Sequence, residues 1–369
     1  MTLKTVRFNT KDKPEFYKVL RKRVNGYFKE NNISKFANAR MKWKTAIILI
    51  AFFTPLVLLL VGLVPNPYVQ VLLWIFMGVG MAGVGLTIMH DANHGSYSKN
   101  QMVNKLLGMT INFAGGYALN WKIQHNVLHH TYTNVVGMDE DIDIGNLMRF
   151  SPVQKKLKAH RFQHIYAWFL YGMMTMMWAT SKDFTQFKRY REKGLLKTQN
   201  VSAGGFLLTL ILSKVGYMGL CLGLPIFLGA MSWWGTVLCF LLMHFIAGLI
   251  LAMVFQPAHV VPSSEYSEVT KNGDIELDWA SNQLMNTANF ANKSRLFSWY
   301  VGGLNFQIEH HLFPNICHIH YKKIADIVRD TAFEYNLPYY SYDTFLKALS
   351  GHANMLYNLG KYDDAPGIH

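Results

Sequence analysis

The sequence predicts an all-α integral membrane fold, with four transmembrane helices in two hairpins and a helical cap on the cytosolic side. The first observation is composition: 51% of the residues are apolar and only 16% are charged, which is unusual for a soluble protein. The second is that the apolar residues fall in long blocks. The third is that Lys and Arg gather in the segments before, between and after the two pairs of blocks, as they do beside membrane spans.

Four of the apolar blocks are long enough to cross a bilayer, since a spanning helix needs about 20 residues at a rise of about 1.5 Å each. Only a few residues separate the first block from the second and the third from the fourth. Each pair is therefore expected to form a tight helical hairpin. The predicted spans are residues 45–64, 69–89, 205–228 and 234–256.

Some apolar segments do not fit a simple span. Lys214 lies within the third predicted span, where a charged side chain is costly, so we expect it to face protein or a water-filled cleft. Residues 106–119 and 164–180 are apolar but short or interrupted. These two segments are expected to lie in the membrane interface or to cap the helical bundle.

The distribution of positive charge predicts the topology. Residues 1–44 contain thirteen Lys or Arg, whereas the links inside the two hairpins contain none. Because Lys and Arg are retained on the cytosolic side, both termini and the middle segment are predicted to be cytosolic. This explains most of the net charge of +14 without a nucleic-acid partner. Attraction to anionic lipid or to an acidic redox partner is compatible with it.

The chain accordingly divides into a basic cytosolic arm, residues 1–44, and a membrane domain, residues 45–369. Within the arm, an amphipathic helix is expected at about residues 14–30. The cytosolic cap is expected to comprise residues 90–204 and 257–369.

Fifteen histidines are present, and many of them cluster where the predicted spans meet the cytosol. HDANH lies at the end of the second span, HNVLHH follows it, FQPAH ends the fourth span, and QIEHH lies in the cap. Their common location on one side of the membrane predicts a metal site. The candidate ligands are His90, His94, His125, His129, His130, His259, Gln307, His310 and His311.

The spacing within the motifs suits chelation. On an α-helix, residues four apart differ by about 40° around the axis, so their side chains share a face. His90 and His94 can thus bind one ion, and so can His125 and His129. In the same geometry His130 is rotated by about 140° from His125, so it is expected to reach a second, adjacent ion.

The number of histidines bears on the number of ions. A lone HxxxH motif is weak evidence, since buried histidines commonly form hydrogen bonds instead. Three clusters together with His259 are much harder to explain in that way. Eight histidines are too many for one ion, so two ions are expected. The imidazole-rich set without thiolates suits iron, zinc, copper or nickel, and a redox-active pair near a bilayer suggests oxygen chemistry.

The order HxxxH, HxxxHH and QxxHH, set around two hairpins, closely resembles the membrane fatty acid desaturase superfamily. The resemblance extends over nearly the whole chain from about residue 45 onward. It implies that the cap holds a di-iron site, with two iron ions, O2 as co-substrate and electrons from an external donor. It also implies that the seven histidines of the three motifs bind the irons and that His259 completes the set.

Gln307 carries a more specific resemblance. In the desaturases called front-end, glutamine replaces the first histidine of the third motif, and the new double bond lies between an existing one and the carboxyl end. The resemblance implies that Gln307 either ligates iron through its amide oxygen or hydrogen-bonds to a ligand. Because the sequence lacks the His-Pro-Gly-Gly motif of a fused cytochrome b5, electrons are expected from a separate cytochrome b5 or ferredoxin.

The expected function is O2-dependent desaturation of a fatty acyl chain, carried as a CoA ester, on a carrier protein or in a glycerolipid, to give a cis double bond. One alternative is a di-iron hydroxylase of the same superfamily, which only product analysis separates from a desaturase. A membrane metal transporter is the alternative from another class. Transport predicts ionisable residues in the middle of several spans, and these spans contain few.

Acidic residues lie beside two of the histidine motifs. Asp91 is inside the first motif, and an acidic run follows the second. These carboxylates are expected either to accept the free ring N–H of metal-bound imidazoles or to form a solvated loop or a helix N-terminus. The run consists of Asp139, Glu140, Asp141 and Asp143.

Overall fold

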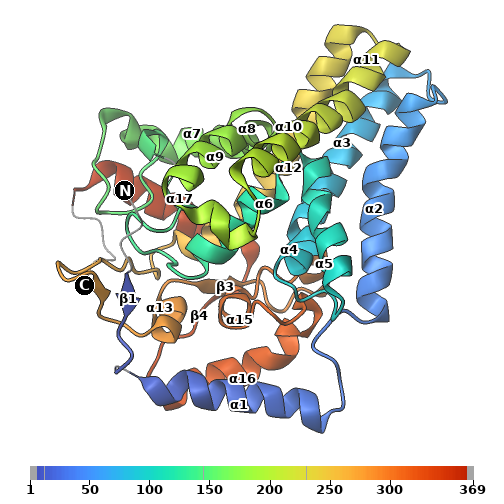
Figure 1. The fold of residues 1–369 in the computed structure, drawn as a ribbon. Helices are drawn as coiled ribbons and strands as arrows, with labels where there is room; N and C mark the ends of the chain where they lie inside the picture. Colours follow the sequence, from blue (N-terminus) through green and yellow to red (C-terminus); the bar gives the residue numbers. More distant parts are fainter. Residues whose placement is uncertain (1–5, 12, 144, 230, 364–369) are drawn as a thin grey trace. The chain divides into compact units, whose positions relative to one another are not determined.

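The computed structural model describes residues 6–11, 13–143, 145–229 and 231–363. These residues fold mostly as helices, as the sequence predicts (Figure 1). They form two compact units. The first unit comprises Asn38–Ile123 and Trp168–Met253, and the second comprises the N-terminal arm up to Ala37, Gln124–Ala167 and the chain from Val254 onward.

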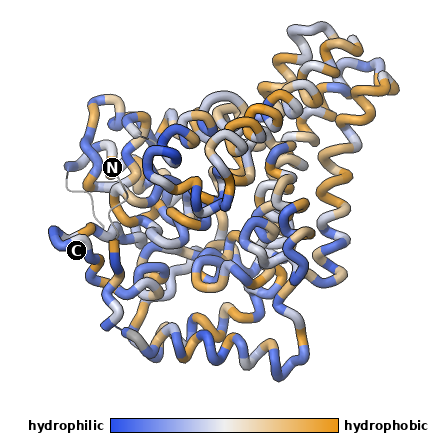
Figure 2. Tube along the Cα trace, in the orientation of Figure 1, coloured by the Kyte–Doolittle hydropathy of each residue, from blue (hydrophilic) through white to orange (hydrophobic). Residues whose placement is uncertain are grey.

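Four helices in the described part of the chain are long and apolar enough to cross a membrane, and Figure 2 shows them as largely hydrophobic. Each overlaps one predicted span and begins before it, but the first ends at Leu60, short of the predicted residue 64. The first begins before residue 45 because the Asn38 side chain accepts a hydrogen bond from Met41 N and so caps the helix. The four helices are α2 (Ala39–Leu60), Pro67–Asn93, Ala203–Leu228 and α12 (Trp233–His259).

Two of these helices contain a π-helical turn. Such turns, with hydrogen bonds from residue i+5 to residue i, are often found at functional sites. The second long helix consists of α3 (Pro67–Gly83), a π-helical turn (Val84–Ile88) and α4 (Met89–Asn93). The third consists of α10 (Ala203–Met218), a π-helical turn (Gly219–Gly223) and α11 (Leu224–Leu228).

In the first unit, α2 and α3 run side by side (Figure 1). Glycine allows them to approach closely: a Cβ atom at Gly80 would lie 2.9 Å from the Cα of Phe52. On α3, a Cβ atom at Gly78 would lie 2.7 Å from the carbonyl oxygen of Met243 on α12. The long helices therefore pack through their backbones, as small residues allow in membrane helices.

Short helices make up the rest of the first unit. The predicted segment 106–119 does not form one helix, because Gly115 adopts a left-handed conformation (φ +78°) that ends a 3₁₀ turn. The short elements are α5 (Gln101–Gly108), a 3₁₀ turn (Met109–Ala114), α6 (Ala118–Trp121), α8 (Met174–Met177), a π-helical turn (Trp178–Lys182), α9 (Asp183–Glu192) and a 3₁₀ turn (Leu195–Gln199).

Lys214, the charged residue within α10, faces protein. Its ammonium group donates hydrogen bonds to the carbonyl oxygens of Gly115 (2.6 Å) and Trp178 (2.7 Å) and forms an ion pair with Asp183. Asn120 Nδ2 donates to the Asp183 carboxylate at 2.9 Å. The two buried charges are thus paired and hydrogen-bonded, as an environment of low dielectric constant requires.

Replacing Lys214 with methionine is expected to destabilise the protein by about 3–5 kcal/mol, because the Asp183 carboxylate would stay buried without its charge partner. Thermal unfolding in detergent, followed by tryptophan fluorescence, would measure the change. The double variant Lys214→Met/Asp183→Asn removes both charges and should recover most of the loss. Equal destabilisation of the single and double variants would contradict this account.

In the second unit, α1 (Pro14–Glu30) and α16 (Tyr321–Glu334) run side by side (Figure 1). The amphipathic helix predicted at about residues 14–30 is therefore confirmed. Its apolar side chains recur every four residues, form one stripe and are buried in the core of this unit. They are Phe16, Leu20, Val24 and Phe28.

The second unit also contains two short parallel strand pairs, which the sequence did not predict. β1 (Arg7–Phe8) pairs with β2 (Asp274–Ile275), and β3 (Ala288–Phe290) pairs with β4 (Tyr340–Tyr342). Two elements cross the boundary between the units: a π-helical segment (Lys122–His129) begins in the first unit, and α7 (Gln163–Gly172) ends there. The remaining elements are 3₁₀ turns (Gly145–Leu147, Lys158–Phe162, His318–His320), α13 (Trp279–Met285), α14 (Arg295–Tyr300), α15 (Gln307–Leu312) and α17 (Phe345–Lys361).

Candidate metal centre

The first histidine pair lies at the end of the second long helix, in the first unit. The π-helical turn Val84–Ile88 leads directly into α4, which carries His90, and His94 is the C-cap of that helix. The two imidazole rings have centroids 4.8 Å apart, as the spacing of four residues predicts. Trp121 packs edge-on against both rings, at 5.5 and 5.6 Å, and so restricts their orientation.

The second motif lies on a π-helix and not on the predicted α-helix. The backbone N–H of His130 donates to the carbonyl of His125 at 2.9 Å, a bond between residues five apart. This wider turn brings residue i+5 back over residue i. The expected rotation of about 140° between His125 and His130 is therefore wrong: their rings have centroids 4.8 Å apart, with the two Nε2 atoms 3.2 Å apart.

The second unit contains a fully buried trio of imidazoles. The candidate ligand atoms of His129, His259 and His311 all lie within 4.8 Å of one another, and each residue is 0% exposed. Nε2 of His129 and both ring nitrogens of His259 have no hydrogen-bond partner among the described residues. Buried polar atoms are nearly always satisfied, so these nitrogens are suited to a metal ion.

A second group shares one member with this trio. The candidate ligand atoms of His130, His310 and His311 also lie within 4.8 Å of one another, and His130 Nε2 is 2.9 Å from His310 Nε2. Two ring nitrogens that face each other at this distance cannot both carry a proton. Each of the two overlapping groups therefore has the ligand types and the spacing that could hold a metal ion.

Two carboxylates of the acidic run orient the second motif. Asp139 accepts a hydrogen bond from His129 Nδ1–H at 2.8 Å, and Asp141 accepts one from His125 Nδ1–H at 2.9 Å. With the proton held on Nδ1 in this way, Nε2 is the ring nitrogen that carries the lone pair a metal ion would bind. Burial lowers the pKa of His125, whereas for His129 burial is outweighed by Asp139 and Asp141, which raise its pKa. Asp143, by contrast, is exposed and accepts from the backbone of the following turn.

The third motif forms the buried helix α15. Gln307, His310 and His311 are each at most 1% exposed. Oε1 of Gln307 is buried and has no hydrogen-bond partner in the described part of the chain. His311 Nδ1–H donates to Gln283 Oε1 at 2.8 Å, and the Tyr321 hydroxyl lies 3.1 Å from His310 Nδ1.

A buried carboxylate holds α15 in place. Glu309 accepts hydrogen bonds from Asn289 Nδ2 and the Tyr339 hydroxyl, both at 2.9 Å. Asn289 Oδ1 also accepts from the backbone N–H of Ile308 at 3.0 Å. Burial raises the pKa of Glu309 to about 7, and the two hydrogen bonds oppose that rise.

Residues of α13 were missed by the sequence analysis. Trp279 Nε1 donates to the carbonyl of His130 at 3.0 Å, and Gln283 supports His311. Asn282 and Asn286 donate to the carbonyl of Thr133, at 3.0 and 3.1 Å. Asn282, Gln283 and Asn286 place three amide side chains within five residues, between apolar segments. This pattern was the signal in the sequence that could have indicated a role for these residues.

Residues 65–343 match the family model for fatty acid desaturases. The chain belongs to the fatty acid desaturase family. It is 34% identical to an sn-1 linoleoyl-lipid 6-desaturase of Synechocystis over 98% of this chain and 99% of the relative. It is 38% identical to the corresponding protein of Arthrospira platensis over 92% and 91%. It is also 32% identical to an acyl-lipid (8-3)-desaturase of Physcomitrium patens over 96% of this chain and 74% of the relative.

The residues of this desaturase fit the metal of its family. Fatty acid desaturases are di-iron enzymes, and imidazoles and an amide oxygen are suitable ligands for iron. Nε2 of His129, both ring nitrogens of His259 and Oε1 of Gln307 are buried and have no hydrogen-bond partner among the described residues, so a metal ion would satisfy them. The carboxylates that fix the imidazole tautomers complete the pattern expected around bound metal.

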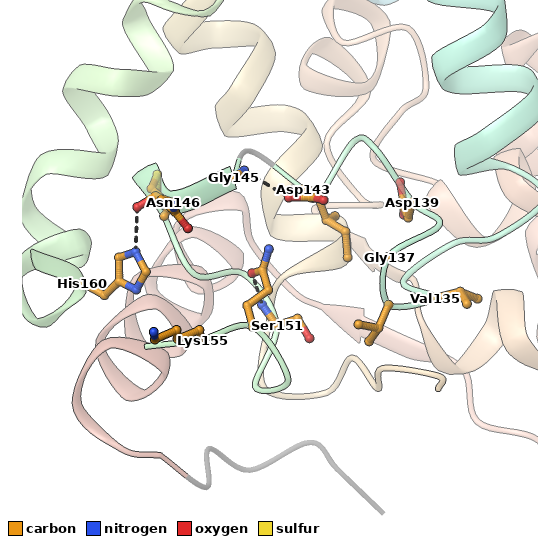
Figure 3. A pocket seen from close by; sticks show the side chains of 13 residues that line it. Val135, Gly137, Asp139, Asp143, Gly145, Asn146, Ser151, Lys155 and His160 are labelled. Atoms are coloured by element: carbon orange, nitrogen blue, oxygen red, sulfur yellow. Dashed lines mark hydrogen bonds between the residues drawn. The ribbon is translucent and has the colours of Figure 1, made fainter. Parts of the chain in front are cut away.

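Beside the desaturase centre, the second unit contains a pocket of about 250 Å³. Figure 3 shows Asp139 at one side of it and Lys155 and His160 at the other. None of the candidate ligands lines the pocket. Asp139, whose carboxylate orients His129, is one of its lining residues.

An Asp139→Asn variant of the desaturase is expected to bind iron about 10–100-fold more weakly, because the carboxylate that fixes the His129 tautomer is lost. Metal content after dialysis against a graded chelator series would measure the effect. Asp143→Asn is the matched control, since this carboxylate is exposed. Equal iron retention by the two variants would show that Asp139 does not support the site.

Proposed function

We propose that the chain catalyses O2-dependent front-end desaturation of a fatty acyl chain in a membrane lipid, forming a cis double bond between an existing one and the carboxyl end. The observation that carries the proposal is the buried convergence of imidazoles in a member of the desaturase family. Within it, Nε2 of His129 and both ring nitrogens of His259 have no hydrogen-bond partner among the described residues. Gln307 in the third motif and the acyl-lipid desaturases among its relatives support the front-end assignment. Those names favour a glycerolipid substrate over a CoA ester or a carrier protein.

The proposed centre holds two iron ions. Bound iron would supply the one-electron redox chemistry that activates O2. The first histidine pair is included because the family pattern places it with the others. The proposed ligands are His90, His94, His125, His129, His130, His259, Gln307, His310 and His311.

The protein side chains around the centre hold protons in place and limit water. Asp139 and Asp141 keep the Nδ1 protons on His129 and His125. The Phe255 ring packs against the rings of His129 (5.2 Å) and His259 (4.8 Å). An apolar cover of this kind favours a dry site, in which the substrate carbon can be positioned without competing solvent.

The proposed membrane arrangement keeps the sequence prediction of two helical hairpins and a cytosolic cap with both termini in the cytosol. The basic arm, residues 1–44, and the membrane domain, residues 45–369, remain the proposed division. The concentration of Lys and Arg outside the hairpin links supports this topology. Electrons are proposed to come from a separate cytochrome b5 or ferredoxin.

Expression in a host of known lipid composition, supplied with mono- and di-unsaturated acyl chains, tests the function. Gas chromatography–mass spectrometry with double-bond localisation should show a new double bond on the carboxyl side of an existing one. A His129→Ala variant should lack this product. A hydroxylated product would overturn desaturation, and fewer than two irons per folded chain would overturn the proposed centre.

A further inference from the structure

One side of α1 carries a cluster of exposed basic side chains. Lys18, Arg21 and Lys22 are all exposed, and their spacing of three and four residues puts them on one face. Lys18 forms a surface ion pair with Glu15, which is a weak interaction. Burial and then the nearby charge of Arg21 lower the pKa of Lys35, so this lysine belongs to the same cluster.

The apolar face of α1 is already covered. Its four apolar residues are buried with α16 in the core of the second unit. The helix therefore has no apolar face to insert into a bilayer, as an interfacial membrane helix does. What remains outward is a positively charged surface, which fits an acidic protein better than a lipid bilayer.

Two aromatic rings connect this surface to the ligand-bearing segments. Tyr17 and Trp279 are both half-buried, with ring centroids 5.2 Å apart in an edge-on contact. The Tyr17 hydroxyl donates to the carbonyl of Leu312 at 3.1 Å, next to His311. Trp279 Nε1–H donates to the carbonyl of His130 at 3.0 Å. Burial raises the pKa of Tyr17, and the positive charge of nearby Arg21 opposes that rise.

We propose that the basic face of α1 (Lys18, Arg21, Lys22 and Lys35) docks a small acidic one-electron carrier protein, and that the Tyr17–Trp279 pair is the route by which its electrons reach the centre. This inference rests on the proposed function. In each turnover the acyl chain gives up two electrons and two protons as its double bond forms. The carrier, oxidised twice by one electron, supplies two more electrons. The four electrons, the two protons from the acyl chain and two protons from solvent together reduce O2 to two waters.

Binding of purified carriers to the iron-loaded, full-length protein tests the docking surface. A soluble cytochrome b5 haem domain and a plant-type ferredoxin would be titrated separately at low and high salt. Lys18→Glu/Arg21→Glu/Lys22→Glu is expected to weaken binding of one carrier at least about 10-fold at low salt, and less at high salt. The matched control is Lys188→Glu/Arg191→Glu/Lys197→Glu, three exposed residues of the first unit, and it should change the affinity less than about twofold.

Several outcomes would overturn the docking surface. The first is that the two triple variants weaken carrier binding equally. The second is that neither carrier binds the wild type in a salt-dependent way. The third is that the α1 triple variant loses binding to anionic phosphatidylglycerol vesicles but keeps its affinity for the carrier. The function is judged separately, by product formed with O2 and a chemical reductant. A wild type that makes no double bond under those conditions refutes the function, whereas altered docking with normal product formation does not.

Stopped-flow oxidation of the reduced carrier, followed by its visible absorbance at saturating concentration without O2, tests the route. Trp279→Leu should slow it at least about 10-fold with unchanged carrier affinity and iron content, because the ring contact is lost. Trp279→Phe keeps a ring but removes the hydrogen bond to His130, and should retain most of the rate. Equal slowing of the two variants, or a wild-type rate for Trp279→Leu, would overturn the route.

Discussion

A His259→Ala variant is expected to lose at least about 100-fold in desaturation and to retain less iron, since a ligand should contribute at least as much as the residues that support ligands. His259 belongs to none of the three spaced motifs and ends α12. It is nevertheless fully buried, and both of its ring nitrogens lack a partner among the described residues. Its ring also lies 4.7 Å from that of His129 and 4.9 Å from that of His311.

Iron would be measured by mass spectrometry on protein purified in detergent, and product by gas chromatography. His164→Ala is the matched control, because His164 is in none of the imidazole groups that could hold a metal. It lies on α7, and its ring packs against Tyr357, near the C-terminal end of α17. The control should retain both iron and activity. A His259→Ala protein with a full complement of iron would show that the centre is complete without it. Unchanged thermal unfolding of metal-free protein would show that the variant still folds.

The long helices could be predicted from the sequence because hydropathy is a local property. A bilayer sets the required length, and each apolar block meets it without reference to the rest of the chain. The ends of the helices were less predictable. Asn38 caps α2 outside the apolar block, and α4 continues past residue 89 because a π-helical turn keeps the backbone bonded.

The geometry of the second motif could not be predicted, because its sequence is compatible with either turn. An α-helix separates His125 from His130, whereas the π-helix brings their rings together. The difference is one residue in the hydrogen-bond pattern, and it depends on the surroundings. The packing of the Phe255 ring against the His125 ring is one of the tertiary contacts in these surroundings.

Support for the ligands comes mainly from sequence-distant residues. Gln283 reaches His311 across 28 residues, and Tyr339 reaches Glu309 across 30. The partner of Lys214, Asp183, is 31 residues away. Asp139 and Asp141 could be suspected because they lie within one short loop of the second motif, but Asp143 had the same claim from sequence and proves to be exposed.

A loss of iron binding is also expected at Gln307. A Gln307→Leu variant should bind iron about 10-fold more weakly and form correspondingly less product. The reason is that a buried amide oxygen, which has no hydrogen-bond partner among the described residues, is replaced by a methyl group. Gln307→His restores a ligand and should recover iron binding. The helix that carries the residue is held by Glu309, Asn289 and Tyr339, so the substitutions should leave its position unchanged.

Mössbauer spectra of iron-57-enriched protein would separate the two possible roles of Gln307. If the amide oxygen is a ligand, the spectrum of one iron site should change in Gln307→Leu and change differently in Gln307→His. If Gln307 only hydrogen-bonds to a ligand, the wild-type and Leu spectra should coincide while the activity falls. Double-bond localisation on the His variant then asks whether glutamine also sets the position of attack: a product shifted along the chain would link this one side chain to front-end selectivity, and an unchanged product would assign selectivity to the acyl-binding walls instead.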